Sequence, residues 1–187
     1  HAALSDSGHK AGAAVVLDIN TGDVVALASL PVFDPNDFIP SIGSEKWAEY
    51  RNSRPSPLLF RATQERYPPG SIFKIITGLA ALESGVVKTS DIMYSPGHYR
   101  LGHRNIGDTA APGEYDFKKA FKHSSNTYFI HHGLACGIEN IIRMGNQFFL
   151  GQRSGLRPRQ EVAGQFPTLE KVRRNWRDGD TANIAIG

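Results

Sequence analysis

The chain has 187 residues, which is enough for one domain with a substantial core and too few for two domains of ordinary size. Apolar residues make up 40% of it and charged residues 21%, a composition that argues against disorder, collagen and coiled coil. The formal net charge of +3 is far from the dense basic stripe that nucleic-acid backbones need. No apolar run approaches the roughly 20 residues that cross a bilayer, and the single cysteine, Cys136, excludes an internal disulfide.

The first third of the chain predicts one hairpin followed by a long irregular connection. Residues 13–19 and 24–30 are apolar runs on either side of an Asn-Thr-Gly-Asp turn at 20–23, a pattern typical of an antiparallel hairpin. Prolines recur between residues 31 and 69 and disfavour long helices there. Only residues 45–50 favour a short helix in this surface connection.

The remaining two thirds predict three helices. Residues 71–84 are apolar on most sides, follow Pro69-Gly70 and end at Gly85, which predicts a buried helix at the centre of the core. After a turn-rich stretch at 86–115, Asp116 is expected to cap a second helix. The third is expected over 138–150, with its core face formed by Ile138, Ile141, Ile142, Phe148 and Phe149. Residues 152–180 are basic and loop-like, and we expect no helix at the apolar end of the chain.

Ser71 and Lys74 are the first candidate catalytic pair. A serine becomes a nucleophile when a base takes its proton and fixed donors stabilise the negative charge that develops. Because residues i and i+3 share a helix face, the Lys74 amine can reach the Ser71 hydroxyl, and an apolar helix with a positive N-terminus favours a neutral amine. The spacing alone leaves a helix cap and a solvated lysine open, since Ser7 and Lys10 repeat it without any helix signal.

A second polar cluster follows at Ser124-Ser125-Asn126, at the junction of a predicted helix and an apolar segment. A hydroxyl can relay a proton to a leaving nitrogen, and an amide can hold the peptide group of a substrate. Ser124 and Asn126 are the candidates for these two tasks. Taken alone, the triplet also fits residues that merely interrupt or cap a helix.

Several motifs, taken together and in order, resemble a known enzyme family. They are Arg61-Ala62-Thr63-Gln64, Tyr67-Pro68-Pro69-Gly70-Ser71-Ile72-Phe73-Lys74, Ser124-Ser125-Asn126-Thr127-Tyr128-Phe129 and the segment 179–187. From about residue 11 to residue 187 the chain resembles the transpeptidase domain of class B penicillin-binding proteins, and its Pro-Pro-Gly-Ser form is most similar to the cell-elongation, penicillin-binding protein 2-like branch. The resemblance implies an α/β fold of the α+β type, shared with serine β-lactamases, in which an antiparallel sheet is joined to a helical subdomain.

The resemblance also implies a chemistry, that of a peptidoglycan D,D-transpeptidase. Ser71 would attack the carbonyl of a stem peptide that ends in D-Ala-D-Ala, Lys74 would take the serine proton, and Ser124 would pass a proton to the departing D-Ala. Asn126 would hold the substrate's amide, and the amine of a second strand would resolve the acyl-enzyme into a cross-link. A β-lactam would mimic the donor and leave Ser71 acylated. This chemistry needs no metal ion and no organic cofactor.

The same resemblance implies a setting and a domain organisation. It places the enzyme at the periplasmic or extracellular face of the cytoplasmic membrane, anchored by an N-terminal segment outside these residues. It implies an elongation-complex glycosyltransferase as a partner, and we expect no binding of nucleic acid. We expect residues 1–10 to be a tag or linker remnant, and residues 11–187 to be the N-terminal and central part of the transpeptidase domain.

The third motif of the family, Lys-Thr/Ser-Gly on a C-terminal strand, is missing from the sequence. Lys88-Thr89-Ser90 is a near match, but it precedes Ser124 and follows the predicted catalytic helix, so both its order and its element are wrong. We therefore expect that the C-terminal strands are missing from this chain. One oxyanion donor accounts for roughly 10²- to 10³-fold in rate, so we also expect low catalytic competence.

Three other interpretations stay open. The Ser-x-x-Lys architecture also occurs in serine β-lactamases and β-lactam sensors, although no Glu-x-x-Leu-Asn motif follows Ser-x-Asn here and class D enzymes usually have Val where Asn126 stands. Some members of the branch hold zinc, and Asp91, His103 and Asp108 could be remnants of such a site. The adjacent His131 and His132 face about 100° apart on a helix and make a poor pair of metal ligands, so we predict no metal. The basic run 171–177 around Trp176 could bind phosphates and stack a base, yet such runs are more often solvated loops.

Overall fold

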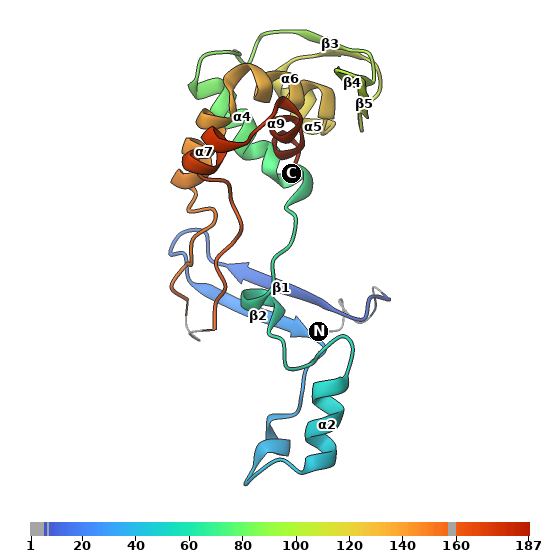
Figure 1. Ribbon diagram of the computed structural model, residues 1–187, viewed down its shortest axis with the longest axis vertical. Helices are drawn as coiled ribbons and strands as arrows, with labels where there is room; N and C mark the ends of the chain where they lie inside the picture. The colour runs from blue at the N-terminus through green and yellow to red at the C-terminus, as the bar shows by residue number, and fades with distance from the viewer. Residues whose placement is uncertain (1–5, 7, 157–159) are drawn as a thin grey trace. The chain divides into compact units, whose positions relative to one another are not determined.

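The computed structural model describes residues 6, 8–156 and 160–187, which belong to two compact units (Figure 1). The first unit comprises residues 1–66 and 153–162, and the second comprises residues 67–152 and 163–187. Helices and antiparallel strands are mixed in the chain, as the expected α+β fold class requires. The expected tag or linker remnant at residues 1–10 lies mostly outside the described residues, and so does Ser7.

The first unit opens with the predicted antiparallel hairpin. Strand β1 (Gly12–Leu17) pairs with β2 (Val24–Leu30), which confirms the prediction. In the turn, the Asp18 carboxylate accepts the backbone N–H groups of Asn20 and Thr21 at 2.7 and 3.2 Å. Gly22 has a φ of 78°, a left-handed conformation that glycine adopts without steric cost. Asx-type hydrogen bonding and a glycine therefore fix this turn locally.

The connection after the hairpin holds more regular structure than the sequence predicted. Helix α2 (Ser44–Asn52) confirms the short helix expected over 45–50. The 3-10 helix η1 (Pro35–Phe38) and the single turn α3 (Arg61–Gln64) were not predicted. Three aromatic rings pack on one another across η1 and α2, those of Phe33, Phe38 and Tyr50. Prolines exclude long helices here but permit short ones that such packing stabilises.

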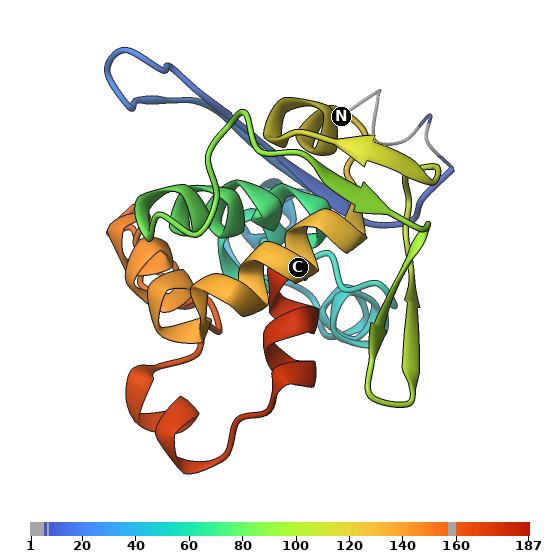
Figure 2. The ribbon, with the colours of Figure 1, turned by 90° about the horizontal axis from the view of Figure 1, so that it is seen from above.

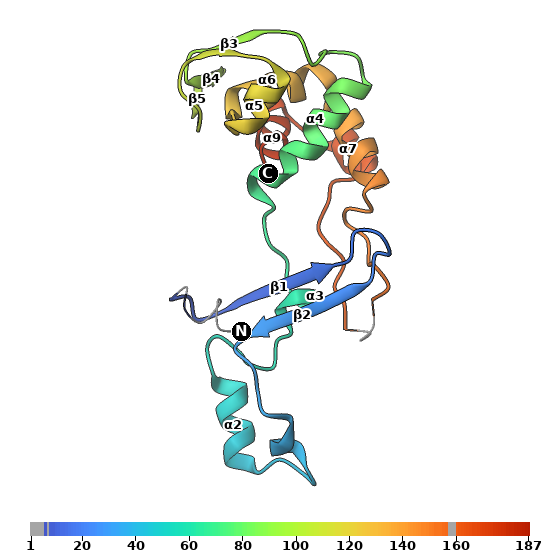
Figure 3. The ribbon, with the colours of Figure 1, turned by 180° about the vertical axis from the view of Figure 1, so that it is seen from behind.

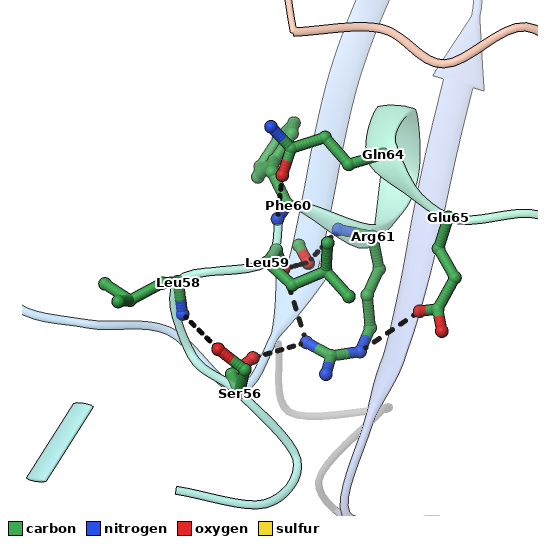
Figure 4. A network of polar contacts seen from close by, with 8 residues as sticks. Ser56, Leu58, Leu59, Phe60, Arg61, Gln64 and Glu65 are labelled. Atoms are coloured by element: carbon green, nitrogen blue, oxygen red, sulfur yellow. Dashed lines mark hydrogen bonds and ion pairs between the residues drawn. The ribbon is translucent and has the colours of Figure 1, made fainter. Parts of the chain in front are cut away.

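Arg61 ties the loop before α3 to the hairpin of the same unit (Figure 4). Its guanidinium donates to the carbonyl oxygens of Ser56 and Leu59 at 2.9 and 3.3 Å, and it lies 3.4 Å from the Glu65 carboxylate. Its backbone N–H donates to Ser29 Oγ on β2 at 2.9 Å. The residue is 5% exposed, and a buried guanidinium is tolerated only when such partners satisfy it.

The second unit is built around two helices, α4 (Lys74–Glu83) and α6 (Asn126–Cys136), which pack against each other (Figure 2). The chain enters α4 through a 3-10 turn, η2 (Gly70–Phe73). The helix predicted over 71–84 is therefore present, but only one of its faces is buried. Its buried face includes Ile76, Ala80 and Ala81, whereas the side chains of Ile72, Ile75 and Leu79 are exposed.

Four further helices belong to the second unit. They are α5 (Phe117–Lys122), α7 (Ile138–Gln147), α8 (Leu169–Arg174) and α9 (Asp178–Ala185). Of these, α7 and α9 pack on the pair formed by α4 and α6, and α8 packs on α7. Asp116 caps α5 as predicted, since its side chain accepts the Lys119 N–H at 2.7 Å. Helix α9 packs closely on α6 at Gly133, where an added Cβ would lie 2.8 Å from the Cβ of Ala185. Small residues on both helices thus allow the close approach.

Two short antiparallel sheets complete the second unit. Strand β3 (Met93–Ser95) pairs with β6 (Gly113–Tyr115), and β4 (His98–Leu101) pairs with β5 (Arg104–Gly107). The sequence indicated only a turn-rich stretch here, because strands of three or four residues are too short to show an alternating pattern. The β4–β5 hairpin lies against α6.

Two sequence predictions near the C-terminal end are wrong. Helix α7 ends at Gln147 rather than at Leu150, and Phe148 and Phe149 are 50% and 72% exposed instead of lying in the core. The segment 152–180 contains α8 and the start of α9, although we expected a loop and no terminal helix. Asp180 accepts the backbone N–H of Arg177 at 3.0 Å, so a capping interaction starts α9 where the hydrophobic pattern is weak.

His132 on α6 makes the stability of the second unit depend on pH. It is 9% exposed, and its Nε2 has no hydrogen-bond partner among the described residues. Burial, together with the neighbouring His131, lowers the pKa of His132 to about 4, although Asp91 opposes the shift. In the unfolded chain an ordinary histidine binds its proton near pH 6.5. Unfolding therefore takes up a proton between these two values, so stability falls as pH decreases from about 6.5 to about 4.

The replacement His132→Leu should flatten this dependence. We expect the native chain to lose on the order of 3 kcal/mol of unfolding free energy between pH 7 and pH 4 through this group, and the variant to keep it. Urea unfolding at a series of pH values measures the difference. The exposed His103→Gln change serves as the control and should leave the slope as it is. A slope that survives in His132→Leu would contradict the assignment.

Candidate active site

Ser71 lies in η2, directly before the helix that carries Lys74. Gly70 in front of it has a φ of 58°, a backbone conformation in which a side chain is strained. The Ser71 side chain is exposed, whereas Lys74 is 2% exposed. The structure therefore has an exposed hydroxyl at Ser71 and a buried amine at Lys74, three residues later.

The Lys74 amine is held by three acceptors from the Ser124–Asn126 segment. Its Nζ donates to the Ser124 carbonyl oxygen at 2.6 Å, to Ser124 Oγ at 2.9 Å and to Asn126 Oδ1 at 2.7 Å. The ring of Phe129 lies 5.9 Å away on another side. Burial lowers the pKa of Lys74, and the Asp108 carboxylate opposes this shift. Three donated hydrogen bonds belong to the ammonium form, whereas burial shifts the equilibrium toward the neutral amine that a general base requires. The neutral amine has two N–H groups and a lone pair that can accept the Ser124 hydroxyl.

Ser124 connects Lys74 to Ser71. Its Oγ donates to Ser71 Oγ at 3.0 Å while it accepts from Lys74 Nζ. In the part of the chain that the structure describes, no direct hydrogen bond joins Lys74 to Ser71. The sequence predicted a direct reach along one helix face, and the observed link passes instead through a hydroxyl from a different segment. The three polar groups form a continuous series for proton movement.

Ser124 has a φ of 55°, which is unusual for a residue with a side chain. Such a conformation costs on the order of 1–3 kcal/mol and persists only where the surroundings determine it. The Ser124 carbonyl oxygen accepts from Lys74 Nζ and from Thr109 Oγ1, and its N–H donates to the Phe121 carbonyl oxygen at 3.2 Å. These contacts aim the Ser124 hydroxyl at Ser71.

Asp108 organises the start of α6. Its carboxylate accepts five hydrogen bonds, at 2.6–3.2 Å, from Ser95 Oγ, Ala110 N, Ser125 Oγ, Asn126 N and Thr127 N. Burial alone would raise the pKa of Asp108, but the hydrogen bonds outweigh burial and hold the pKa at about 2. Sequence reasoning considered this residue only as a remnant of a zinc site, because no local pattern connects it with the Ser-x-Asn motif.

Asn126 is fixed at both ends of its side-chain amide. Its Oδ1 accepts from Lys74, and its Nδ2 donates to the Gly107 carbonyl oxygen at 3.0 Å. The four candidates from the sequence, Ser71, Lys74, Ser124 and Asn126, are thus brought together in one cluster within the second unit.

The alternative sites considered in the sequence have less support. Among residues 6, 8–156 and 160–187, no group of three or more His, Cys, Asp or Glu side chains could hold a metal ion. In the basic run, Arg174 is paired with Glu170 at 2.6 Å on α8. The indole N–H of Trp176 donates to Thr181 Oγ1 at 2.8 Å, so this ring is engaged within its own unit.

Comparisons of sequence with known proteins agree with this geometry. Residues 12–187 match the family model described as the penicillin binding protein transpeptidase domain. The chain is 33% identical to the peptidoglycan D,D-transpeptidase MrdA of Haemophilus influenzae and 31% identical to that of Escherichia coli K12, over 94% of its own length in both cases. It spans only 28% and 29% of the length of these two relatives.

Solved structures show the same similarity. Penicillin-binding protein PBP2 of Pseudomonas aeruginosa, crystallised with WCK 5153, matches with a TM-score of 0.89 at 33% identity, over 100% of this chain and 44% of that one. PBP2 of Helicobacter pylori, in a complex with MreC, matches with a TM-score of 0.90 at 30% identity, over 99% and 36%. These similarities confirm the fold expected from the motifs, and with the family match they show that the chain belongs to the penicillin-binding protein transpeptidase family, in its penicillin-binding protein 2 type.

Proposed function

We propose that the protein is a peptidoglycan D,D-transpeptidase whose Ser71 is acylated by stem peptides ending in D-Ala-D-Ala. The observation that carries the proposal is the hydrogen-bonded series from Ser71 Oγ through Ser124 Oγ to Lys74 Nζ. The names of the MrdA relatives support the same activity. Residues 11–187 are assigned to the N-terminal and central part of the transpeptidase domain.

Acylation uses this series as a path for the proton. When Lys74 is neutral, the two hydroxyl hydrogen bonds reverse, so that Ser71 donates to Ser124 and Ser124 donates to Lys74 Nζ. Ser71 Oγ then attacks the carbonyl carbon of the penultimate D-Ala, and its proton passes through Ser124 to the Lys74 amine. The tetrahedral intermediate collapses when its C–N bond breaks, and Ser124 returns a proton to the departing amine of the terminal D-Ala. An ester on Ser71 and free D-Ala result.

Deacylation runs through the same groups in the opposite direction. The amine of a second stem peptide attacks the ester carbonyl and loses a proton through Ser124 to Lys74. The Ser71 oxygen leaves and regains its proton, and a new peptide bond links the two strands. Asn126 holds the amide of the donor peptide, because its side chain is already fixed by Lys74 and Gly107 and keeps its place during the reaction.

The setting of the enzyme is part of the proposal. The PBP2 of Helicobacter pylori was solved in a complex with MreC, which supports a place in a cell-elongation complex. We extend this to an elongation-complex glycosyltransferase as partner, and to a location at the outer face of the cytoplasmic membrane with an anchor outside these residues. Where the structure describes the chain, no helix combines the length and apolarity needed to cross a membrane.

A penicillin adduct located by peptide mapping tests the proposal. Trypsin cleaves after Arg66 and Lys74, so Ser71 is the single serine of the peptide 67–74, whereas Ser124 and Ser125 fall in the peptide 123–143. After incubation of the full-length protein with benzylpenicillin we expect a stable one-to-one adduct on 67–74. No adduct, or an adduct on 123–143, would contradict the proposal. An adduct that forms and is hydrolysed rapidly would indicate a β-lactamase-like enzyme instead.

A further inference from the structure

A cavity on the β4–β5 hairpin is lined by basic and polar side chains. Its volume is about 280 Å³, and its lining residues are His98, Arg100, His103, Arg104 and Asn105. None of these is acidic, and neither arginine forms an ion pair with a described carboxylate. Guanidinium groups bind carboxylates through paired hydrogen bonds, so this cavity suits an anionic group.

The β4–β5 hairpin, which carries these residues, lies beside α6 (Figure 3). Alternate residues of a strand share a face, and Arg100 is paired with Asn105, so one face carries His98, Arg100 and Asn105, all of which are exposed. Arg104 is paired with Leu101 and so belongs to the other face, but it adjoins the turn of the hairpin, where its exposed side chain also lines the cavity. On the other face Tyr99 is partly buried, with its ring 6.4 Å from that of His131 on α6. Tyr99 packs toward α6, whereas the cavity is lined by Arg100 from the open face and by His103 and Arg104 at the turn end of the hairpin.

The strand that carries this basic cavity ends at the candidate active site. Gly107, the last residue of β5, accepts the hydrogen bond from Asn126 Nδ2 at 3.0 Å. A strand advances about 3.3 Å per residue, so the backbones of Asn105 and Arg104 lie about 7 and about 10 Å from that of Gly107. An extended peptide covers the same distance in two to three residues.

We propose that the β4–β5 hairpin is a carboxylate-binding subsite for the stem peptide, in which Arg100 and Arg104 bind a carboxylate two or three residues before the attacked carbonyl. This inference rests on the proposed function, since it concerns the same substrate. It follows from the position of the cavity along β5 and from its unpaired positive charge. The subsite selects donor strands by charge at a place that a small β-lactam does not reach.

Binding measurements on the full-length protein test the subsite. Two synthetic peptides end in D-Ala-D-Ala and carry one further carboxyl group, two or three residues before the attacked carbonyl. This carboxyl group is free in one peptide and amidated in the other, and the peptides are otherwise identical. The Arg100→Gln/Arg104→Gln double variant should bind the free-carboxylate peptide about tenfold more weakly than the native protein. The amidated peptide should bind both proteins equally, and added salt should reduce the difference.

A second double variant controls for net charge. Lys118→Gln/Arg173→Gln removes two exposed positive charges of the same unit that do not line the cavity, and it should bind both peptides as the native protein does. Equal loss in the two double variants would overturn the subsite. Binding of inorganic phosphate is measured in the same way. Phosphate that binds more tightly than the peptide, and only when both cavity arginines are present, would identify a phosphate site and would also overturn the carboxylate subsite.

The test separates this inference from the proposed function. Penicillin acylation of Ser71 is measured on the native protein, independently of the peptides. Native protein without an adduct would remove the proposed function. A stable adduct on Ser71 together with unchanged peptide binding in the Arg100→Gln/Arg104→Gln variant would overturn the subsite alone.

Discussion

Replacing Lys74 with methionine should slow penicillin acylation of Ser71 by about a thousandfold. General bases contribute on the order of 10²- to 10⁴-fold in rate, and Lys74 Nζ is the group at the end of the hydrogen-bonded series from Ser71. Methionine fills a similar volume with an apolar chain but accepts no proton from Ser124. The rate is measured as the growth of the adduct mass with time.

The variant Lys74→Arg separates base chemistry from charge. A guanidinium keeps the positive charge but does not lose its proton near neutral pH, so this variant should be as slow as the methionine variant. In the native protein the acylation rate should rise with pH through an apparent pKa below the ordinary 10.5 of lysine, because burial lowers the pKa of Lys74. An arginine variant with the native rate would rule out Lys74 as the base.

The change Asp108→Asn should destabilise the protein by about 3 kcal/mol. An asparagine of the same shape carries an NH₂ group where the carboxylate accepts hydrogen bonds, so some of the five donors around Asp108 lose their acceptor. Since these donors include the N–H of Asn126 and the hydroxyl of Ser125, acylation should also slow about tenfold. Urea unfolding measures the first effect and adduct formation measures the second.

Acid sensitivity provides an independent readout for Asp108. The pKa of this carboxyl is about 2 in the folded state against 3.8 ordinarily, so its stabilisation is present above about pH 4 and is lost as pH falls toward 2. The variant should lack this loss. Asp116→Asn is the matched control, because Asp116 accepts one backbone N–H as the cap of α5 and asparagine caps helices equally well. A native-like stability of Asp108→Asn would show that the five hydrogen bonds contribute little.

Local signals in the sequence determined several parts of this protein. The hairpin over 12–30 follows from two β-branched runs and a turn whose Asp18 and Gly22 act on their own neighbours. The cap at Asp116 likewise acts within one turn. The place of Ser71 and Lys74 at the start of one apolar helix follows from a proline-glycine entry and three-residue spacing. Each of these features depends on residues within a few positions of each other.

Only the tertiary structure decided how the candidate site is assembled. The link from Lys74 to Ser71 runs through Ser124, a residue 50 positions away from Lys74, and its direction depends on a strained backbone that no propensity predicts. Of the five donors to Asp108, only the N–H of Ala110 is local; the others lie at the end of β3 and at the start of α6, and packing brings them to one carboxylate. Helix α9 forms on the surface that Gly133 leaves open rather than from a hydrophobic pattern of its own. Hydrogen bonds between distant segments exist only after the helices have packed, and therefore leave no periodic signal in the sequence.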